Sequence, residues 1–477
     1  MKGIFPAAIL VATLAAAGCT TVGPDYARPQ ISLPGDFSLN ENKAEPHIPG
    51  EWWRLYGDSK LDALVAATLA NNADLRFAAA RVEEAEGVLR EAGAAFFPEV
   101  TGGYSFGRNR VSTRTVPPPA ATAPLTRPQY QLLASTSFEL DFWGRYSRAD
   151  EAARANLLNS RYSRDVVGLT LASAAAQSYF GLRSLDAQLA VLALTIGARN
   201  DSLELARARL NAGIASALDV LQAQGALSDA LVQRRETGRQ RAILERQLGQ
   251  LTGQLDLRVQ AGELFALPVP PTPPAGLPSA LLDRRPDIRA AEESLAASNA
   301  QIGVARAALF PAISLTGALG AQSAMFSNLL GSGAGIWSLG YALALPIFDG
   351  GRRDARVDQA VARQHQALAG YQKAVETGFR EVSEGLTNVA ESGAAETELA
   401  ARLKAARDAL EFSNLRYEAG YSPFLEVLDA QRTANEAELA FVRNRQSRLS
   451  YSVDLMKALG GGWIDREPRA AVRPASP

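Results

Sequence analysis

The sequence predicts a mixed α + β membrane protein with an internal tandem repeat, in which pairs of short strands interrupt very long helices. Three observations predict this fold class. Landmarks in the 477-residue chain recur about 207 residues apart. Each repeat holds a helical stretch of about 66 residues and two alternating segments of about ten residues. The repeat organises the whole chain.

Composition excludes several classes of protein. Lys and Arg number 49 against 50 Asp and Glu, so the net charge of -1 argues against nucleic-acid binding by the whole chain. One Cys and two His exclude a zinc cage or a disulfide framework. No run of about 18 apolar residues follows the N-terminal segment, which argues against a helical membrane protein.

The N-terminus has the pattern of a secretory signal over residues 1–18: a Lys, an apolar stretch and then small residues. The small residues before the unique Cys19 resemble a bacterial lipobox, although Ala16 stands where Leu is usual. This resemblance implies a diacylglycerol on the Cys19 thiol and an acyl chain on the new amino terminus. Thr20, by the same resemblance, favours the outer membrane. An ordinary secretory peptide followed by a chance cysteine is the alternative.

The repeat is clearest around Gly213 and Gly420, where AGIASALDVLQAQ matches AGYSPFLEVLDAQ. Together with the N-terminal pattern, this match divides the chain into six predicted segments. They are a lipoprotein signal peptide at 1–18, an extended lipid-anchored segment at 19–58, a first repeat at 59–258, a Pro-rich linker at 259–279, a second repeat at 280–460, and a flexible tail at 461–477.

Both repeats follow one plan of helix, two strands, long helix, Gly turn and final helix. The first has a helix near 59–95, strands 99–113 and 129–142, long helix 145–211 and helix 217–252. The second has a helix near 280–308, strands 311–323 and 337–348, long helix 352–418 and helix 424–459. Ser59-x-x-Asp62 predicts a capped start. Pro98 and Pro311 end the first helices, and Pro423 suits a first helical position.

The long helices carry a heptad seam, which predicts coiled-coil packing. Its members are spaced by alternating fours and threes: Leu192, Ile196, Arg199, Leu203, Ala206 and Leu210, then Leu399, Leu403, Ala406, Leu410, Ser413 and Tyr417. At ~1.5 Å per residue, each long stretch would measure roughly 100 Å.

The alternating segments are predicted to be membrane strands. In 337–347, large apolar residues alternate with Ser, Gly and Ala, and 130–142 and 313–321 alternate similarly. Their length suits a tilted strand that crosses a bilayer; a soluble sandwich is the alternative. Four strands cannot close a barrel, and an open edge is not tolerated in lipid. Two copies give eight strands, whose interior fills with side chains. Three copies give a 12-stranded channel, which favours a homotrimer.

In combination, several motifs resemble the outer membrane factor family, the TolC-like channels, in its OprM-like lipoprotein branch. They are Gly23-Pro24-Asp25-Tyr26, Glu51-Trp52-Trp53, Arg285-Pro286-Asp287-Ile288-Arg289, Pro346-Ile347-Phe348-Asp349-Gly350-Gly351 and the repeated AG…L-[DE]-V-L-x-A-Q. The resemblance implies a trimeric 12-stranded barrel in the outer membrane, continued by a periplasmic helical coiled-coil barrel. It implies a periplasmic membrane-fusion adaptor and an inner-membrane resistance-nodulation-division pump as partners. The transported class that the resemblance implies is drugs or other small toxic compounds: detergents, dyes, organic solvents or metal ions. We expect no cofactor and no bound metal.

Two kinds of site are predicted at the ends of the long helices. Gly213 and Gly420 would form adaptor-docking tips, or would only cap their helices. Leu425, Asp429 and Arg432 share one helix face. By resemblance, they match the residues that narrow the periplasmic gate. A solvated Asp–Arg pair within the helix is the alternative for them.

No residue set indicates an enzyme. The glycines at 331, 333 and 335 precede a strand rather than a helix, so they do not form a nucleotide loop. His47 and His365 have no partner spacing. The apolar cluster at 325, 326, 329 and 330 either narrows the outer mouth or packs as an ordinary loop. The rival functions are the duct of a type I protein secretion system and a non-transporting periplasmic scaffold.

Overall fold

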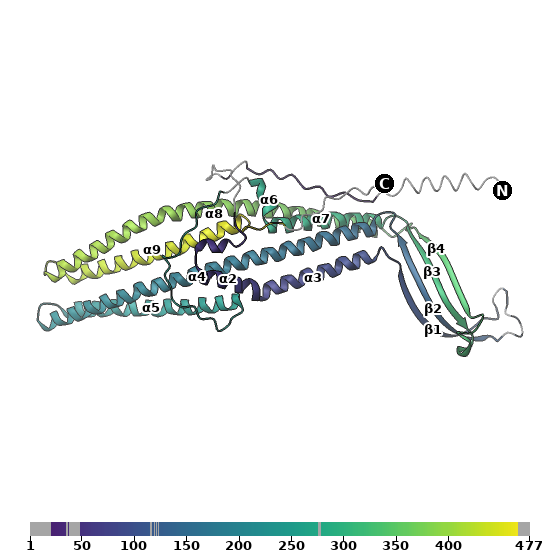
Figure 1. The fold of residues 1–477 in the computed structure, drawn as a ribbon, viewed down its shortest axis with the longest axis horizontal. Helices are drawn as coiled ribbons and strands as arrows, with labels where there is room; N and C mark the ends of the chain where they lie inside the picture. Colours follow the sequence, from purple (N-terminus) through teal and green to yellow (C-terminus); the bar gives the residue numbers. More distant parts are fainter. Residues whose placement is uncertain are drawn as a thin grey trace. The chain divides into compact units, whose positions relative to one another are not determined.

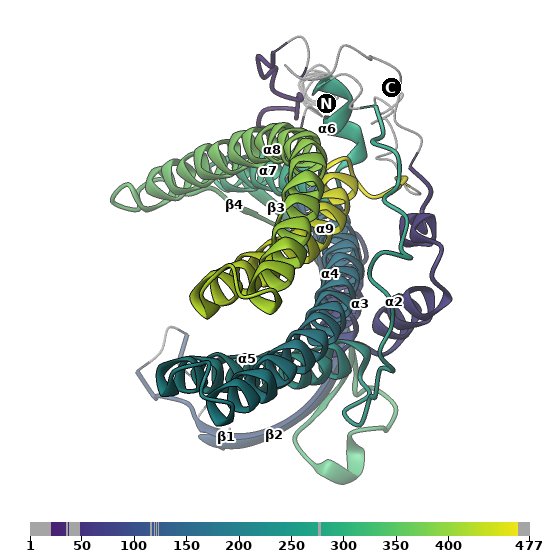
Figure 2. The ribbon, with the colours of Figure 1, turned by 90° about the vertical axis from the view of Figure 1, so that its left-hand side faces the viewer.

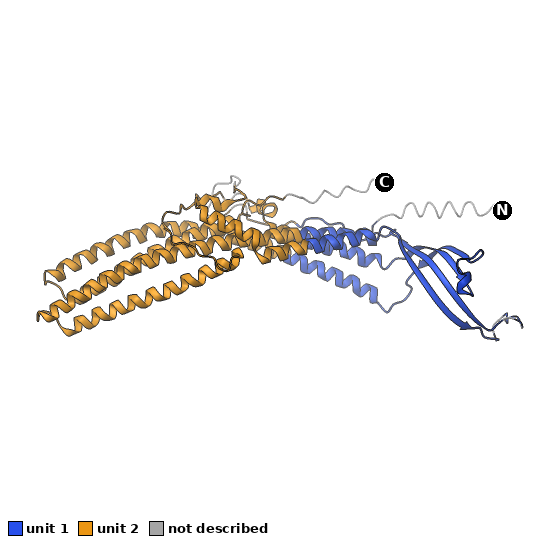
Figure 3. Cartoon of the chain, turned by 60° about the horizontal axis from the view of Figure 1, so that its bottom comes forward, with its two compact units in different colours: residues 1–29, 83–159, 291–370 blue, residues 30–82, 160–290, 371–477 orange. Residues whose placement is uncertain are grey.

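The computed structural model describes residues 21–465 apart from 35–36, 38–47, 115–116, 119, 121, 123 and 275–277. Residues 1–29, 83–159 and 291–370 form one compact unit, and residues 30–82, 160–290 and 371–477 form a second (Figure 3). Each unit therefore takes segments from both sequence repeats. The first unit contains the four strands, and the second contains the turns that end the long helices (Figure 1).

The first unit holds a four-stranded antiparallel sheet in the order β1-β2-β3-β4. Its strands are β1 (Glu99–Arg110), β2 (Thr126–Leu140), β3 (Ala312–Ser323) and β4 (Gly335–Ala344). The strand expected over 337–348 ends at Ala344, two residues before Pro346, because proline has no N–H for the ladder. β2 begins three residues earlier than the expected 129, and β1 ends at Arg110 rather than 113.

The strand register sorts side chains by polarity between the two faces. Thr101 lies opposite Ser135, Ser135 opposite Ala318, and Ala318 opposite Ser338. Positions one residue along bring the large apolar side chains together on the other face, as in the pairing of Leu319 with Trp337. A slip of one residue in any pairing would mix the two faces. The alternation seen in the sequence is thus kept across all four strands.

Two helices of equal length begin 207 residues apart, α4 (Arg145–Asn211) and α8 (Arg352–Glu418), with 67 residues each. α5 (Ala217–Thr252) lies beside α4, and α9 (Phe424–Ala458) beside α8, in both ribbon views (Figures 1 and 2). Within the described part, α4 alone is long and apolar enough to span a membrane by length and composition. Its side chains at Tyr179 and Phe180 pack instead into the core of the second unit.

Much of the predicted heptad seam is buried. Leu203 and Ala206 of α4 pack with Ala223 of α5. They also pack with Tyr417 of α8 and Phe424 of α9, the two helices of the second helical hairpin. Farther from the turn, Leu403 and Ala406 of α8 pack with Ala434 and Ala437 of α9. Alternation of Leu with Ala lets two helices approach closely along a narrow seam.

The first helix of each repeat is broken, contrary to the single helices expected over 59–95 and 280–308. In the first repeat α2 (Ser59–Asn71) ends before Asn72, whose extended backbone separates it from α3 (Ala73–Ala94). The Asn72 side chain accepts from Asp74 N at 2.8 Å and so starts the next helix. In the second repeat α6 (Leu281–Arg284) and α7 (Pro286–Ala307) are separated by Arg285. A residue before proline is pushed out of the helical region.

Two predicted helix starts lie one residue from their place in the structure. Asp58, not Ser59, caps α2, since its carboxylate accepts from the backbone N–H groups of Lys60 and Leu61. Pro423 is the N-cap of α9 rather than its first helical residue. Asp and Pro both suit a helix start, so sequence alone does not separate the neighbouring positions.

Candidate channel wall, tips and gate

The sheet presents one polar and one apolar face, as a channel wall requires. On the polar face, Thr101 and Ser135 share a hydroxyl hydrogen bond of 3.0 Å. A hollow of about 330 Å³ runs across all four strands beside these residues, with Ser137, Thr316 and Ser338 also in its lining. Small hydroxyl side chains leave room for solvent and solutes along this face.

The opposite face is apolar and open. Exposed fractions are 69% at Leu319, 78% at Trp337, 81% at Leu339 and 80% at Tyr341. A soluble sandwich would bury such a face against a second sheet, but the described residues hold one sheet. This face is therefore the one that contacts lipid.

The loop between β3 and β4 folds back onto the apolar face. Phe326 meets the rings of Tyr104 and Tyr130 with centroids 6.5 and 5.8 Å apart. Leu329 is 5% exposed, whereas Leu330 points to solvent. Of the two expectations for this cluster, the contacts fit loop packing on the sheet. The glycines at 331, 333 and 335 lie in this turn and at the start of β4.

The first described residues of the chain contact the segment after β2 and then the helices α4 and α7. Val22 N–H donates to the carbonyl of Trp143 at 3.0 Å, just past the end of β2. Asp25 pairs with Arg148 at 2.6 Å, and Arg28 pairs with Glu292 at 2.7 Å. Cys19 lies outside the described residues.

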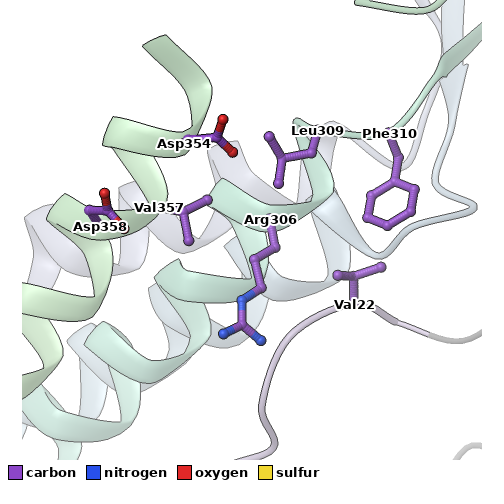
Figure 4. Close-up of a pocket in the computed structure, with 7 residues that line it drawn as sticks. All are labelled: Val22, Arg306, Leu309, Phe310, Asp354, Val357 and Asp358. Atoms are coloured by element: carbon purple, nitrogen blue, oxygen red, sulfur yellow. The ribbon is translucent and has the colours of Figure 1, made fainter. Parts of the chain in front are cut away.

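A pocket of about 320 Å³ opens next to Val22 (Figure 4). Its apolar walls are Val22, Leu309, Phe310 and Val357, and its charged members are Arg306, Asp354 and Asp358. Asp354 and Asp358 come from the start of α8, and Arg306 from the end of α7. Among the described residues, no group of three or more His, Cys, Asp or Glu is placed to hold a metal ion.

Gly213 and Gly420 end the two long helices in the same conformation, with φ of 76° and 80°. In each turn the N–H of the following residue donates five residues back, from Ile214 to Arg209 and from Tyr421 to Arg416. This is a Schellman cap, which places glycine at the left-handed position. A Cβ at either glycine would meet no atom within 4 Å. The capping role is thus present, and the surface around each glycine is open.

Arg209 joins the two tips and was missed in the sequence. Its guanidinium donates to the carbonyls of Tyr417 and Glu418, both at 3.0 Å, and lies 4.3 Å from the centre of the Tyr417 ring. Those carbonyls end α8, where the helix dipole favours a cation. The 207-residue spacing pairs Arg209 with Arg416 and would have drawn attention to it.

The three predicted gate residues lie in the first turns of α9 on exposed surface. Leu425 is 61% exposed. Arg432 donates to Asp429 and to Glu436, both at 2.8 Å. These two hydrogen bonds raise the pKa of the Arg432 guanidinium. Within one chain, Asp429 and Arg432 form the intrahelical pair that was the alternative to a gate, and the Leu425 side chain is mostly exposed.

Comparisons with known proteins agree with this arrangement. The family described as outer membrane efflux protein matches residues 64–254 and 277–461, one segment in each repeat. The chain is 34% identical to the toluene efflux pump outer membrane protein TtgF of Pseudomonas putida, over 96% of this chain and 98% of that one. It is 32% identical to the cation efflux system protein CusC of Escherichia coli, over 94% and 97%.

A solved structure has the same fold. The open state of the MtrE outer membrane channel from Neisseria gonorrhoeae superposes with a TM-score of 0.82 at 28% identity, over 93% of this chain and 98% of that chain. The predicted fold class, with four strands and long helices in two repeats, is confirmed, as are the outer-membrane location and the family resemblance. The chain belongs to the outer membrane efflux protein family and is an outer membrane channel of an efflux pump.

Proposed function

We propose that three copies of this chain close a 12-stranded barrel and form the exit duct of a tripartite pump. The observation that carries this proposal is the open sheet. β1 and β4 are its edges, and each is paired on one side only among the described residues. Unpaired backbone groups in lipid cost several kcal/mol each, so both edges require partners.

The strand order supplies those partners. Since neighbours alternate in direction from β1 to β4, β4 of one copy runs antiparallel to β1 of the next. Closure through this pairing continues the polar face inside and the apolar face outside. Native mass spectrometry of the purified protein should report three chains. A dimer or a monomer that conducts ions would contradict the proposal.

We propose that the duct receives its cargo from a periplasmic membrane-fusion adaptor and an inner-membrane pump of the resistance-nodulation-division class. The open surface around Gly213 and Gly420 supports docking at the tips. Crosslinking in cells, followed by purification through this chain and identification of the captured proteins, tests the assignment. Capture of an ATP-driven secretion pump would favour the alternative, a type I protein secretion duct.

The cargo proposed is a small organic toxin, such as a drug or solvent. Relatives are named for toluene, antibiotic and cation efflux. The chain contains 3 Met and 2 His, and His365 lies exposed on α8. Soft metal ions favour thioether and imidazole ligands, so this inventory favours organic cargo. A deletion strain should become sensitive to solvents and dyes; sensitivity confined to silver or copper would contradict this.

We also propose that a lipid is attached at Cys19. A relative in Salmonella typhimurium is named a probable outer membrane lipoprotein. Val22 is fixed beside the end of β2, and three residues span at most about 10 Å. The chain length between Cys19 and Val22 therefore allows a lipid attached at Cys19 close to that strand end. Mass spectrometry of the mature N-terminus should find a triacylated cysteine, and a mature N-terminus elsewhere would contradict it.

A further inference from the structure

The β1–β2 hairpin is strongly basic at one end. Between residues 100 and 138 the chain has four charged residues, all arginine: Arg108, Arg110, Arg114 and Arg127. Residues 312–348, which form β3, β4 and their loop, contain no charged residue. The end of the sheet that carries the two strand-connecting loops thus bears four positive charges and no negative ones. The structure records no ion pair for Arg108 or Arg110 within the described part.

The register places two of these arginines on the lipid-facing side. Arg108 lies opposite Pro128 and Arg110 opposite Thr126, on the face that also carries Phe106. Both side chains are exposed. Arg127 lies opposite Asn109, on the polar face. The hairpin therefore divides its charge between the outside of the wall and its inside.

Side chains on the outer face follow an order from apolar to aromatic to basic. Leu132 lies opposite Tyr104, and the next outward pair is Tyr130 with Phe106, whose ring centroids are 4.7 Å apart. Arg108 is the next outward residue of β1 after Phe106, and Arg110 follows it. Phe326 closes over the aromatic level from the neighbouring loop.

This order matches the layers of a membrane surface. Aliphatic side chains suit the acyl region, and aromatic rings suit the boundary between acyl chains and headgroups. Arginine pairs with phosphate through two parallel hydrogen bonds. Arg108 and Arg110 are about 7 Å apart along the strand, by the ordinary rise per residue. They can therefore engage two phosphate groups or two sides of one headgroup.

We infer that this outward patch, Tyr104, Phe106, Arg108, Arg110, Tyr130 and Phe326, binds a phosphorylated glycolipid of the outer leaflet. The inference rests on the proposed orientation, in which the helices extend into the periplasm and the strand-connecting loops face outward. Charge complementarity selects the lipid: two cations and no carboxylate in the patch favour an anionic headgroup over a zwitterionic one. The aromatic level beneath the arginines gives the acyl chains a surface to pack on.

Native mass spectrometry of the full-length protein in detergent tests the inference. The probes are bisphosphorylated lipid A and the same lipid with its phosphates removed. Wild-type protein should retain the phosphorylated form preferentially. Arg108→Gln with Arg110→Gln should lower retention about tenfold, since each arginine near anionic headgroups contributes substantially to binding. Equal retention of both lipids by wild-type protein would overturn the inference.

A matched control separates position from total charge. Arg114→Gln with Arg127→Gln removes the same charge from the loop and from the polar face, and retention should stay within about twofold of wild type. If both double variants lose lipid equally, the patch is not a site. Unchanged migration of the assembled protein on gels verifies folding.

Orientation is measured separately. A cysteine in the β1–β2 loop, Ser112→Cys, should react with a membrane-impermeant maleimide in intact cells, with the wild-type chain as the background. Labelling only in broken cells would contradict the orientation, while the lipid-retention result would still decide binding.

Discussion

The two repeats have the same order of long helices and strands and use different side chains at equivalent positions. At the tips, Arg209 and Arg416 are 207 residues apart. Arg209 crosses to the other hairpin and donates to the carbonyls of Tyr417 and Glu418. Arg416 pairs with Glu426 of its own hairpin at 3.2 Å. The first tip therefore supplies the donor that joins the two helical hairpins, and the second tip supplies the acceptor carbonyls.

The helix breaks show the same division. Asn72 donates to the carbonyl of Leu251 at 3.0 Å, and Arg285 donates to the carbonyl of Ala458 at 2.9 Å. The two carbonyls are again 207 residues apart, at the ends of α5 and α9. Arg285 also pairs with Asp287 and Glu381, so the second repeat replaces an amide contact with a buried arginine that has two partly exposed carboxylate partners. Duplication thus preserved the need for a donor at the break while the donor changed.

The largest effect is expected from bulk at both tips. Gly213→Trp combined with Gly420→Trp should abolish efflux and leave assembly intact, because a large side chain blocks close approach of the adaptor. A non-glycine residue at positive φ costs only about 1–2 kcal/mol. Dye accumulation in a complemented deletion strain measures efflux. The double Ala variant, which imposes the same backbone strain without bulk, should keep most activity; equal loss in both would assign the glycines to capping alone.

The helix breaks should differ in their contribution to stability. Arg285→Ala removes the hydrogen bond to the Ala458 carbonyl and the cation beside two partly exposed carboxylates, so it should lower the free energy of unfolding by about 2 kcal/mol. Asn72→Ala removes one hydrogen bond and a helix cap, and it should lower the free energy of unfolding by about 1 kcal/mol. Denaturation of the purified protein, followed by circular dichroism, compares them. Arg285→Lys should recover part of the loss. Equal losses at the two positions would erase the distinction between the repeats.

The gate predicted at Leu425, Asp429 and Arg432 would make the second repeat functionally distinct. Leu218 matches Leu425, but Gln222 and Gly225 stand where the second repeat has Asp429 and Arg432. Asp429→Ala with Arg432→Ala should raise the conductance of the protein in a planar bilayer severalfold, because the pair would hold the closed arrangement.

The first repeat supplies the matched control for that measurement. Gln222→Ala with Gly225→Ala should leave conductance at the wild-type level. Wild-type conductance in the Asp429–Arg432 variant would instead support the solvated pair, whose contribution to stability is small because solvent screens it.

The smallest expected effect concerns pH at a position where the repeats differ, Tyr162 against Ala369. Burial and the hydrogen bond to Asp465 raise the pKa of Tyr162 to about 12. An unfolded tyrosine titrates near 10. The folded state therefore holds this proton more tightly, and its stabilisation is complete below about pH 10 and lost as pH rises toward 12. Tyr162→Phe should reduce the fall in the free energy of unfolding between pH 10 and 11 by about 1 kcal/mol. An unchanged slope in pH-dependent melting would contradict the assignment.

The sequence by itself determined the duplication, the lengths of the long helices and the polarity of the strand faces. Gly213 and Gly420, and the alternation around Trp337, are local signals, because helix capping and strand pleating depend on neighbours in the chain. The predicted ends of both long helices coincide with those of α4 and α8. The break at Asn72 was missed although Asn is a common helix cap and its side chain accepts from Asp74 N–H. The amide also donates to the carbonyl of Leu251, 179 residues away, and the sequence does not show that contact.

Only the tertiary structure decided which side chains meet across the fold. In the sequence, Arg209 does not differ from the other charged residues of α4. The structure shows that it donates to two carbonyls of α8. Phe326 reads as part of a loop until it lies against Tyr104 and Tyr130. Arg108 and Arg127 share a hairpin, and the pairing register assigns them to opposite faces. Contacts between residues far apart in the chain depend on register and packing, which periodicity within a single element does not specify.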